Sequence, residues 1–230
     1  MRKSQFAAEA EGAFRQFVLQ PEYPCLGAKA AVNSNTCTLK VYPELGGDEG
    51  TANLANDLAD FARDQDHAPA NFATFAAVFA RPHSMSEIEF ERLLWKQLRA
   101  LHGHDAARFD WDPSVSSDPA DPHFSFSCGG QAMYVIGLHA NSSRAARRFP
   151  WPALVFNPHR QFEKLRADGK WKRLQGAIRE RDEELQGTTN PMLSDFGERS
   201  EAVQYSGRQT SSDWQAPFVA SSAARCPFSH

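Results

Sequence analysis

One cysteine stands where a loop passes into a run of small residues. Cys25 is followed by Gly27 and by the segment 28–32, which reads as a short helix. The first backbone N–H groups of that helix would point at the sulfur, and Lys29 would add positive charge. Both would stabilise a thiolate, which serves as a nucleophile or as a ligand for a soft metal. The alternative is a buried cysteine that packs beside a turn as a small hydrophobic residue.

A histidine ends a second segment with possible chemistry. His139 follows the apolar stretch 132–138, so one ring nitrogen could enter a pocket at the end of a strand. Three arginines, Arg144, Arg147 and Arg148, come shortly after it. Guanidinium groups bind carboxylates in a forked geometry, so this segment is a candidate for holding the carboxylates of a cofactor or of an acidic ligand. The alternative is a hydrogen-bonded histidine with surface arginines.

A second histidine opens a long polar helix predicted over 159–185. Pro158 suits the first helical position and Asn157 suits the cap. His159 would then lie in the first turn, where the helix dipole disfavours a charged imidazole. A neutral ring able to bind a metal is therefore expected. A purely structural cap is the alternative.

The segment after residue 187 carries polar side chains between aromatic residues. Asn190, Asp195, Glu198 and Glu201 are the candidates to bind a substrate. Carboxylates on a loop with aromatic anchors suit a cationic ligand, because a buried cation needs a paired carboxylate. A solvated loop is the alternative.

Composition limits the class of protein. The 230 residues carry 25 Lys and Arg against 28 Asp and Glu, a net charge of −3, which argues against nucleic acid as a partner. No apolar run approaches the ~18 residues of a membrane helix, and the polar start shows no secretory signal. The four cysteines lie far apart, which argues against a disulfide scaffold and a structural zinc site. We expect a cytoplasmic protein with reduced thiols that spans no membrane.

Hydrophobic periodicity predicts the elements that would position these residues. It predicts long helices at 4–19, 49–66, 87–102 and 159–185, the last with a break at Gly169 left open. It predicts strands at 36–42, 72–79 and 153–156, and a β-hairpin over 124–138 around Gly129 and Gly130. This order favours an α+β fold, a mixed and partly antiparallel sheet packed with helices, in one domain over 1–230. The irregular segment 187–230 would pack on it through aromatic anchors.

Several segments in one order resemble the YqcI/YcgG family over about residues 20–218. They are PCLGAKAAVN at 24–33, FERLLWKQLRALH at 90–102, FSFSCGGQAMYVIGLHANSSRAARRF at 124–149, LVFNPHRQFEKLR at 154–166, IRERD at 178–182, NPMLSDFG at 190–197 and QYSGR at 204–208. The Cys25 loop also resembles the haem-thiolate loop of thiolate-ligated cytochrome monooxygenases.

The family resemblance implies an enzyme that hydroxylates a guanidine nitrogen of L-arginine or a related guanidino compound. It implies a b-type haem, dioxygen or peroxide as oxidant, and an electron donor that the sequence does not identify; whether the chain forms a homodimer is left open. Cys25 is the preferred iron ligand, because a thiolate favours O–O cleavage, with His139 and His159 as alternatives. A histidine that does not bind iron could deliver protons. Gly27, Lys29 and the three arginines complete the cofactor site.

Two other functions stay open. One is a haem-binding or sensing protein without turnover, and the other is a haem-free protein of the same fold that binds a small anion. One departure bears on the resemblance. Family members tend to end in Trp-x-Cys-Pro-Phe, whereas Ala216 takes the place of that cysteine here and Cys226 follows ten residues later.

Overall fold

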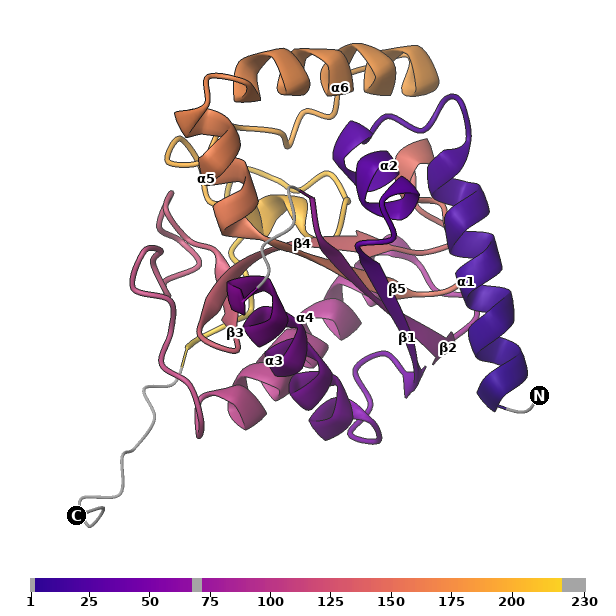
Figure 1. Cartoon of the computed structure of the whole chain (residues 1–230), viewed down its shortest axis with the longest axis vertical. Coiled ribbons are helices and arrows are strands. Elements are labelled where there is room, and N and C mark those ends of the chain that lie inside the picture. Colours follow the sequence, from indigo (N-terminus) through magenta and orange to yellow (C-terminus); the bar gives the residue numbers. More distant parts are fainter. Residues whose placement is uncertain (1–2, 68–71, 221–230) are drawn as a thin grey trace.

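A five-stranded mixed sheet forms the centre of the computed structural model, which describes residues 3–67 and 72–220. The strands lie in the order β1-β2-β5-β4-β3 (Figure 1). β1 and β2 are parallel, and every other neighbouring pair is antiparallel. The predicted α+β class with a partly antiparallel sheet is therefore confirmed. The strand bounds are Cys37–Glu44 (β1), Thr74–Arg81 (β2), Phe126–Cys128 (β3), Gln131–Leu138 (β4) and Ala153–Pro158 (β5).

Helices cover both faces of this sheet (Figure 1). One face packs against α3 and α4, and the other packs against α1, while α2, α5 and α6 lie around one end. The helix bounds are Lys3–Leu19 (α1), Leu26–Asn33 (α2), Thr51–His67 (α3), Glu87–Asp105 (α4), His159–Ala167 (α5) and Trp171–Gln186 (α6).

Strand β2 shows why the sheet is buried on both sides. Phe75 and Phe79 point to the cluster with α3 and α4, whereas Ala76 and Val78 belong to the cluster with α1. Side chains alternate between the faces of a strand, so a continuous apolar run is what a strand covered on both faces requires.

Three local predictions can be compared with the backbone. Gly129 and Gly130 both have positive φ in the hairpin turn between β3 and β4, as predicted. Gly169, at φ +68°, ends α5 and divides the predicted long helix into two. The predicted cap at Asn157 is wrong. Asn157 lies inside β5, and its amide group is already engaged across the sheet, where Oδ1 accepts from Thr74 Oγ1 at 2.5 Å.

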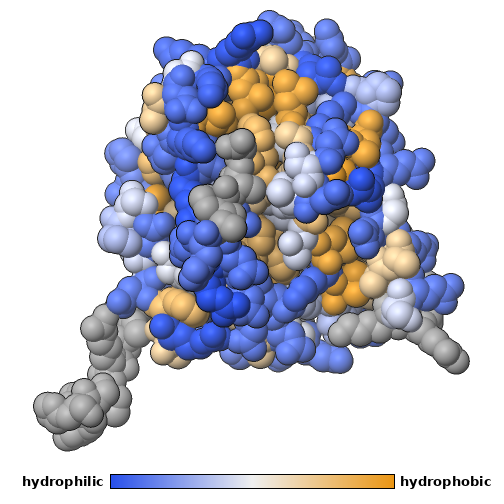
Figure 2. All heavy atoms as spheres, viewed as in Figure 1, coloured by the Kyte–Doolittle hydropathy of each residue, from blue (hydrophilic) through white to orange (hydrophobic). Residues whose placement is uncertain are grey.

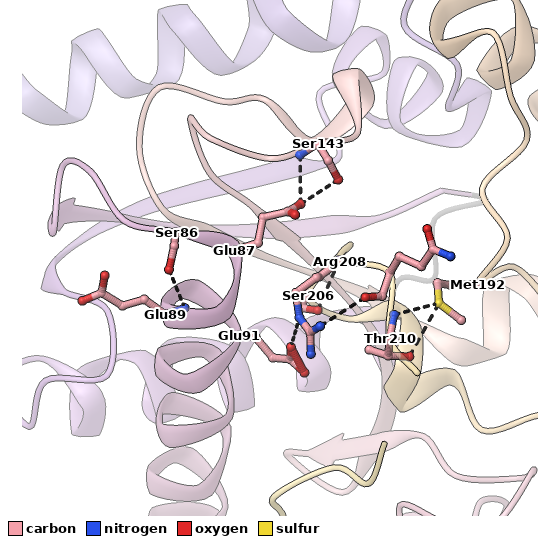
Figure 3. Close-up of polar contacts among 10 residues, drawn as sticks. Ser86, Glu87, Glu89, Glu91, Ser143, Met192, Ser206, Arg208 and Thr210 are labelled. Atoms are coloured by element: carbon pink, nitrogen blue, oxygen red, sulfur yellow. Dashed lines mark hydrogen bonds and ion pairs between the residues drawn. The ribbon is translucent and has the colours of Figure 1, made fainter. Parts of the chain in front are cut away.

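The C-terminal segment is irregular but firmly attached as far as residue 220. It contains one 3-10 turn, Glu201–Gln204, and its Tyr205 and Phe218 are buried in the main core. Arg208 pairs with Glu91 on α4, and Thr210 donates to the sulfur of Met192 (Figure 3). The segment that carries the predicted substrate-binding residues is thus part of the packed fold. Cys226 lies outside the described residues.

Candidate functional site

A cavity of about 240 Å³ lies between α2, α5 and α6. Its floor is formed by the sheet, through Tyr134 and Ile136 of β4, and its remaining wall is formed by the segment 190–204. Hydrophobic side chains gather below α6, between α5 and α2, on the face shown in Figure 2. The cavity brings together residues from segments about 180 positions apart in the sequence. A concave space with largely apolar walls and a few polar groups is what a small-molecule site requires.

Cys25 lines this cavity at the start of α2. It is the N-cap residue, and its Sγ accepts a hydrogen bond from the backbone N–H of Ala28 at 3.4 Å. Burial raises the pKa of the Cys25 thiol, while the N–H groups of Ala28 and Gly27 and the charge of Arg147 oppose that rise. Burial prevails, so the sulfur keeps its proton unless a metal displaces it.

The two neighbours assigned to the Cys25 loop differ in position. Gly27 lines the cavity, and a Cβ there would lie 3.2 Å from the ring of Phe72, so the absence of a side chain makes room for that ring. Lys29 lies away from the cavity lining, and its Nζ donates to the carbonyl oxygens of Gln20 and Pro21 at 2.7 and 3.0 Å. Its charge is used to hold the loop and not to face the sulfur.

The two candidate histidines occupy different environments. His159, the first residue of α5, lines the cavity and packs its ring 4.4 Å from that of Phe196. Its burial lowers the pKa of the imidazole, so the ring is neutral and able to accept a proton or bind a metal. His139 lies outside the cavity lining, stacked on Phe90 at 4.3 Å, and neither ring nitrogen has a hydrogen-bond partner among the described residues.

Only Arg147 of the three predicted arginines faces the cavity. Arg144 pairs with Asp182 of α6, and Arg148 donates to the carbonyl oxygens of Ser142 and Ser143. Both are therefore used inside the fold.

The guanidinium of Arg147 is buried and held by backbone alone. Nη1 donates to Gly137 O at 3.0 Å and to Tyr205 O at 3.3 Å, and Nη2 donates to Gln204 O at 3.1 Å. Within the described ranges no carboxylate forms an ion pair with it. A buried cation with only neutral partners is costly, and an anionic group bound in the cavity would offset that cost.

Glu201 is the carboxyl group most deeply placed on the cavity wall. Its Oε1 accepts from Tyr205 Oη at 2.6 Å and from Ser125 Oγ at 2.8 Å. Burial raises the pKa of Glu201 to about 8 despite these hydrogen bonds. The side chain is thus an uncharged acid near neutral pH, and a cation bound beside it would favour the ionised form.

Of the other three residues predicted to bind a substrate, one lines the cavity and two do not. Asn190 lines the cavity, where its Oδ1 accepts from the N–H of Met192 at 3.0 Å. Asp195 instead pairs with Arg179 of α6 at 3.5 Å, and Glu198 accepts from the N–H of Asp195 at 3.3 Å. These two carboxylates fix the loop beneath α6 and do not line the cavity.

Helix α6 forms one wall of the cavity, and this wall was not predicted from the sequence. The cavity-facing residues of this helix follow the spacing i, i+4, i+7, i+8 and i+11, which is one helical face. That spacing was available in the sequence, but polar residues within it hid the pattern. The residues are Trp171, Gln175, Ile178, Arg179 and Asp182.

The protein thus belongs to the α+β class, and one cysteine, one histidine and one buried arginine face its small, largely apolar cavity. The family model for the YqcI/YcgG family matches residues 14–219, so the chain belongs to that family. It is 25% identical to the uncharacterized protein YqcI of Bacillus subtilis (strain 168) over 149 residues, which are 63% of this chain and 58% of that relative. No solved structure matches the chain.

Across residues 3–67 and 72–220, no three His, Cys, Asp or Glu side chains gather as a set that could hold a metal ion by themselves. In the same ranges, none of the helices combines the length and the apolar character needed to cross a membrane.

Proposed function

We propose that this protein is a haem-dependent oxygenase that hydroxylates a guanidine nitrogen of L-arginine or a related guanidino compound. The observation that carries the proposal is the meeting of Cys25 and His159 on one apolar-walled cavity with the buried cation of Arg147. The proposal also draws on the family resemblance for the type of reaction.

The chemistry of the cavity-lining residues suits an iron porphyrin. A soft sulfur donor and an imidazole are both ligands that haem iron accepts. The walls are largely aromatic and aliphatic, as a flat hydrophobic macrocycle requires, and include Phe72, Phe162 and Ile178. Cys25 is our choice of iron ligand, with His159 as the alternative on the same cavity. His139 is the weaker candidate, because its ring lies outside the cavity lining.

The protein's own groups would bind and orient the substrate. When bound, a thiolate-ligated haem supplies the oxidising chemistry that an unreactive guanidine nitrogen needs. Glu201 would pair with the guanidinium of the substrate. That positive charge would favour the ionised carboxylate, which would release its proton to solvent. His159, neutral at physiological pH, would accept or return a proton at a ring nitrogen. The apolar walls would exclude water from the reacting atoms.

Product analysis tests this function. The purified protein, supplied with haem, a reductant, dioxygen and L-arginine or another guanidino compound, should yield a product with one added oxygen on nitrogen. Cys25→Ala should abolish the product. Cys37→Ala is the matched control, because Cys37 is a free cysteine on β1 outside the cavity lining. A haem-loaded protein that forms no hydroxylated product from any guanidino compound would overturn the proposed activity.

Arg147 supports a second candidate, a haem-free protein that binds a small anion. Its guanidinium is buried, faces the cavity and has only backbone carbonyl partners. Purified protein with no affinity for haem, but with a small carboxylate bound in a way that Arg147→Met abolishes, would favour this candidate.

A further inference from the structure

The cavity wall carries a hydrogen-bond donor that has no acceptor. Trp171 is the first residue of α6, and its Nε1 is buried without a hydrogen-bond partner among the described residues. Its indole ring packs against Phe162, with 5.7 Å between ring centroids, and lines the cavity. A buried N–H group without an acceptor costs free energy. An acceptor on a bound ligand would remove that cost.

A guanidinium lies directly over the same indole. The Cζ atom of Arg166, in the last turn of α5, is 5.0 Å from the ring centroid of Trp171 and 5.7 Å from that of Phe196. Cation–π contacts with two aromatic rings hold the guanidinium at the cavity wall.

The existing partner of Arg166 leaves room for a second anion. Nη1 donates to Glu163 Oε1 at 2.5 Å, and the Glu163 side chain is 52% exposed, so this pair is weak. Only one of the five N–H donors of the guanidinium has a hydrogen-bond partner within the part of the chain that the structure describes. The charge of Arg166 acts on both His159 and Glu201, which places it within the electrostatics of the cavity.

We propose, on the basis of the haem site proposed above, that Arg166 and Trp171 form a carboxylate-binding pair that takes a propionate of the cofactor. The guanidinium edge and the indole N–H would donate to the oxygens of one carboxylate, in a charge-assisted arrangement. The pair replaces Arg144 and Arg148, which the sequence had suggested for this role and which the fold uses elsewhere.

A comparison of haem with its dimethyl ester tests the pair, because esterification removes the carboxylate charges and leaves the porphyrin ring unchanged. The wild-type protein should bind haem at least about tenfold more tightly than the ester, as a charge-assisted hydrogen bond is worth roughly 1.5–3 kcal/mol. Arg166→Gln and Trp171→Phe should each reduce this preference several-fold. Trp171→Phe keeps an aromatic ring and removes the N–H donor. Arg173→Gln, an exposed arginine on the same helix, should leave the preference unchanged.

The outcomes separate the two proposals. Haem bound by all variants with an unchanged preference over the ester would overturn the carboxylate pair and leave the haem site standing. A wild-type protein that binds neither compound would overturn the haem site, and the pair with it. Thermal melting of each variant checks that a lost preference does not come from loss of the fold.

Discussion

Burial controls the charge of the side chains that face the cavity. It raises the pKa of the Cys25 thiol and of the Glu201 carboxyl, and it lowers the pKa of the His159 imidazole. In each case the neutral form is favoured, because a low-dielectric environment penalises charge. The charged groups left on the walls of the free cavity are its arginines and Asp182, which pairs with Arg144. A ligand with complementary charge would change the protonation of the groups that it meets.

The raised pKa of Glu201 predicts how the free energy of unfolding depends on pH. Burial raises the pKa of its carboxyl to about 8 in the folded protein, against 4.5 for an exposed glutamate. The folded state therefore holds the proton more tightly than the unfolded chain, and this contribution to stability is fully present below pH 4.5 and lost as the pH rises towards 8. Glu201→Gln removes the titration, so its free energy of unfolding relative to wild type should increase from pH 5 to pH 8.

Urea denaturation at several pH values measures this difference. Glu198→Gln is the control, because Glu198 does not line the cavity. A Glu201→Gln variant whose stability follows the wild-type pH profile would show that the carboxyl group ionises normally in the folded protein.

At the scale of elements, α6 is attached to the fold differently from the other helices. Asp182 is its one buried residue, and one face of the helix lines the cavity. The helix lies along the top edge of the molecule in Figure 1. Polar contacts hold its C-terminal half, among them the ion pairs of Asp182 with Arg144 and of Arg179 with Asp195, and the hydrogen bond that Gln186 accepts from the N–H of Ala145 at 2.7 Å. A helix held in this way should open more readily than the core strands.

Asp182→Asn should weaken the attachment of α6 to the rest of the fold. Removal of one partner of a buried ion pair leaves an uncompensated charge and costs about 3–5 kcal/mol. Hydrogen exchange should therefore quicken at the amides of α6 and stay unchanged in β5. Glu184→Gln, at an exposed position of the same helix, is the control. Equal exchange in α6 of both variants would contradict a role for the ion pair in holding the helix.

The packing of β4 against α4 predicts a sharp effect at one glycine. A Cβ on Gly137 would lie 2.6 Å from Cε1 of Phe90 and 2.8 Å from the carbonyl oxygen of Tyr205. Gly137→Ala should destabilise the protein by about 1–3 kcal/mol, because the core has no space for the extra methyl group. Gly12→Ala on α1, where a Cβ meets nothing within 4 Å, should stabilise it by about 0.5–1 kcal/mol. Urea denaturation measures both, and an unchanged midpoint for Gly137→Ala would contradict the packing described.

On the scale of the whole molecule, the C-terminal segment completes both the core and the cavity. Phe218 packs its ring near those of Trp95, Trp111 and Phe126, and Glu201 lines the cavity. The sequence indicated that aromatic anchors hold this segment, since polar loops rarely carry so many. It did not indicate which core residues these anchors pack against, because contacts between distant segments leave no periodic signal.

Two truncations test the role of the segment. A chain that ends at residue 220 keeps Phe218, loses Cys226 and should unfold at the wild-type urea concentration, with unchanged haem binding. A chain that ends at residue 212 also loses Trp214 and Phe218, and should be destabilised by at least about 3–5 kcal/mol, the usual cost of one deleted core phenylalanine. Loss of haem from the chain that ends at residue 220 would point to Cys226 and contradict our choice of Cys25.

The local part of this fold was predictable, and the site was predictable only in part. The periodic patterns predicted the elements, and the glycine pair at 129 and 130 predicted the hairpin. The arginines show the limit. Arg144, Arg147 and Arg148 are neighbours in sequence, yet only Arg147 faces the cavity, because the short 3-10 turn Ala145–Arg147 directs them apart. Arg166 and Trp171 were missed because their pairing depends on how α6 folds back over α5.

The absorption spectrum of the ferrous carbon monoxide complex tests the central claim most directly. A haem ligated by the Cys25 thiolate should show the red-shifted Soret band typical of thiolate ligation. Cys25→Ser should lose that band, while Cys37→Ser should keep it. Wild-type protein that binds no haem, or a Cys25→Ser spectrum identical to that of wild type, would contradict the account.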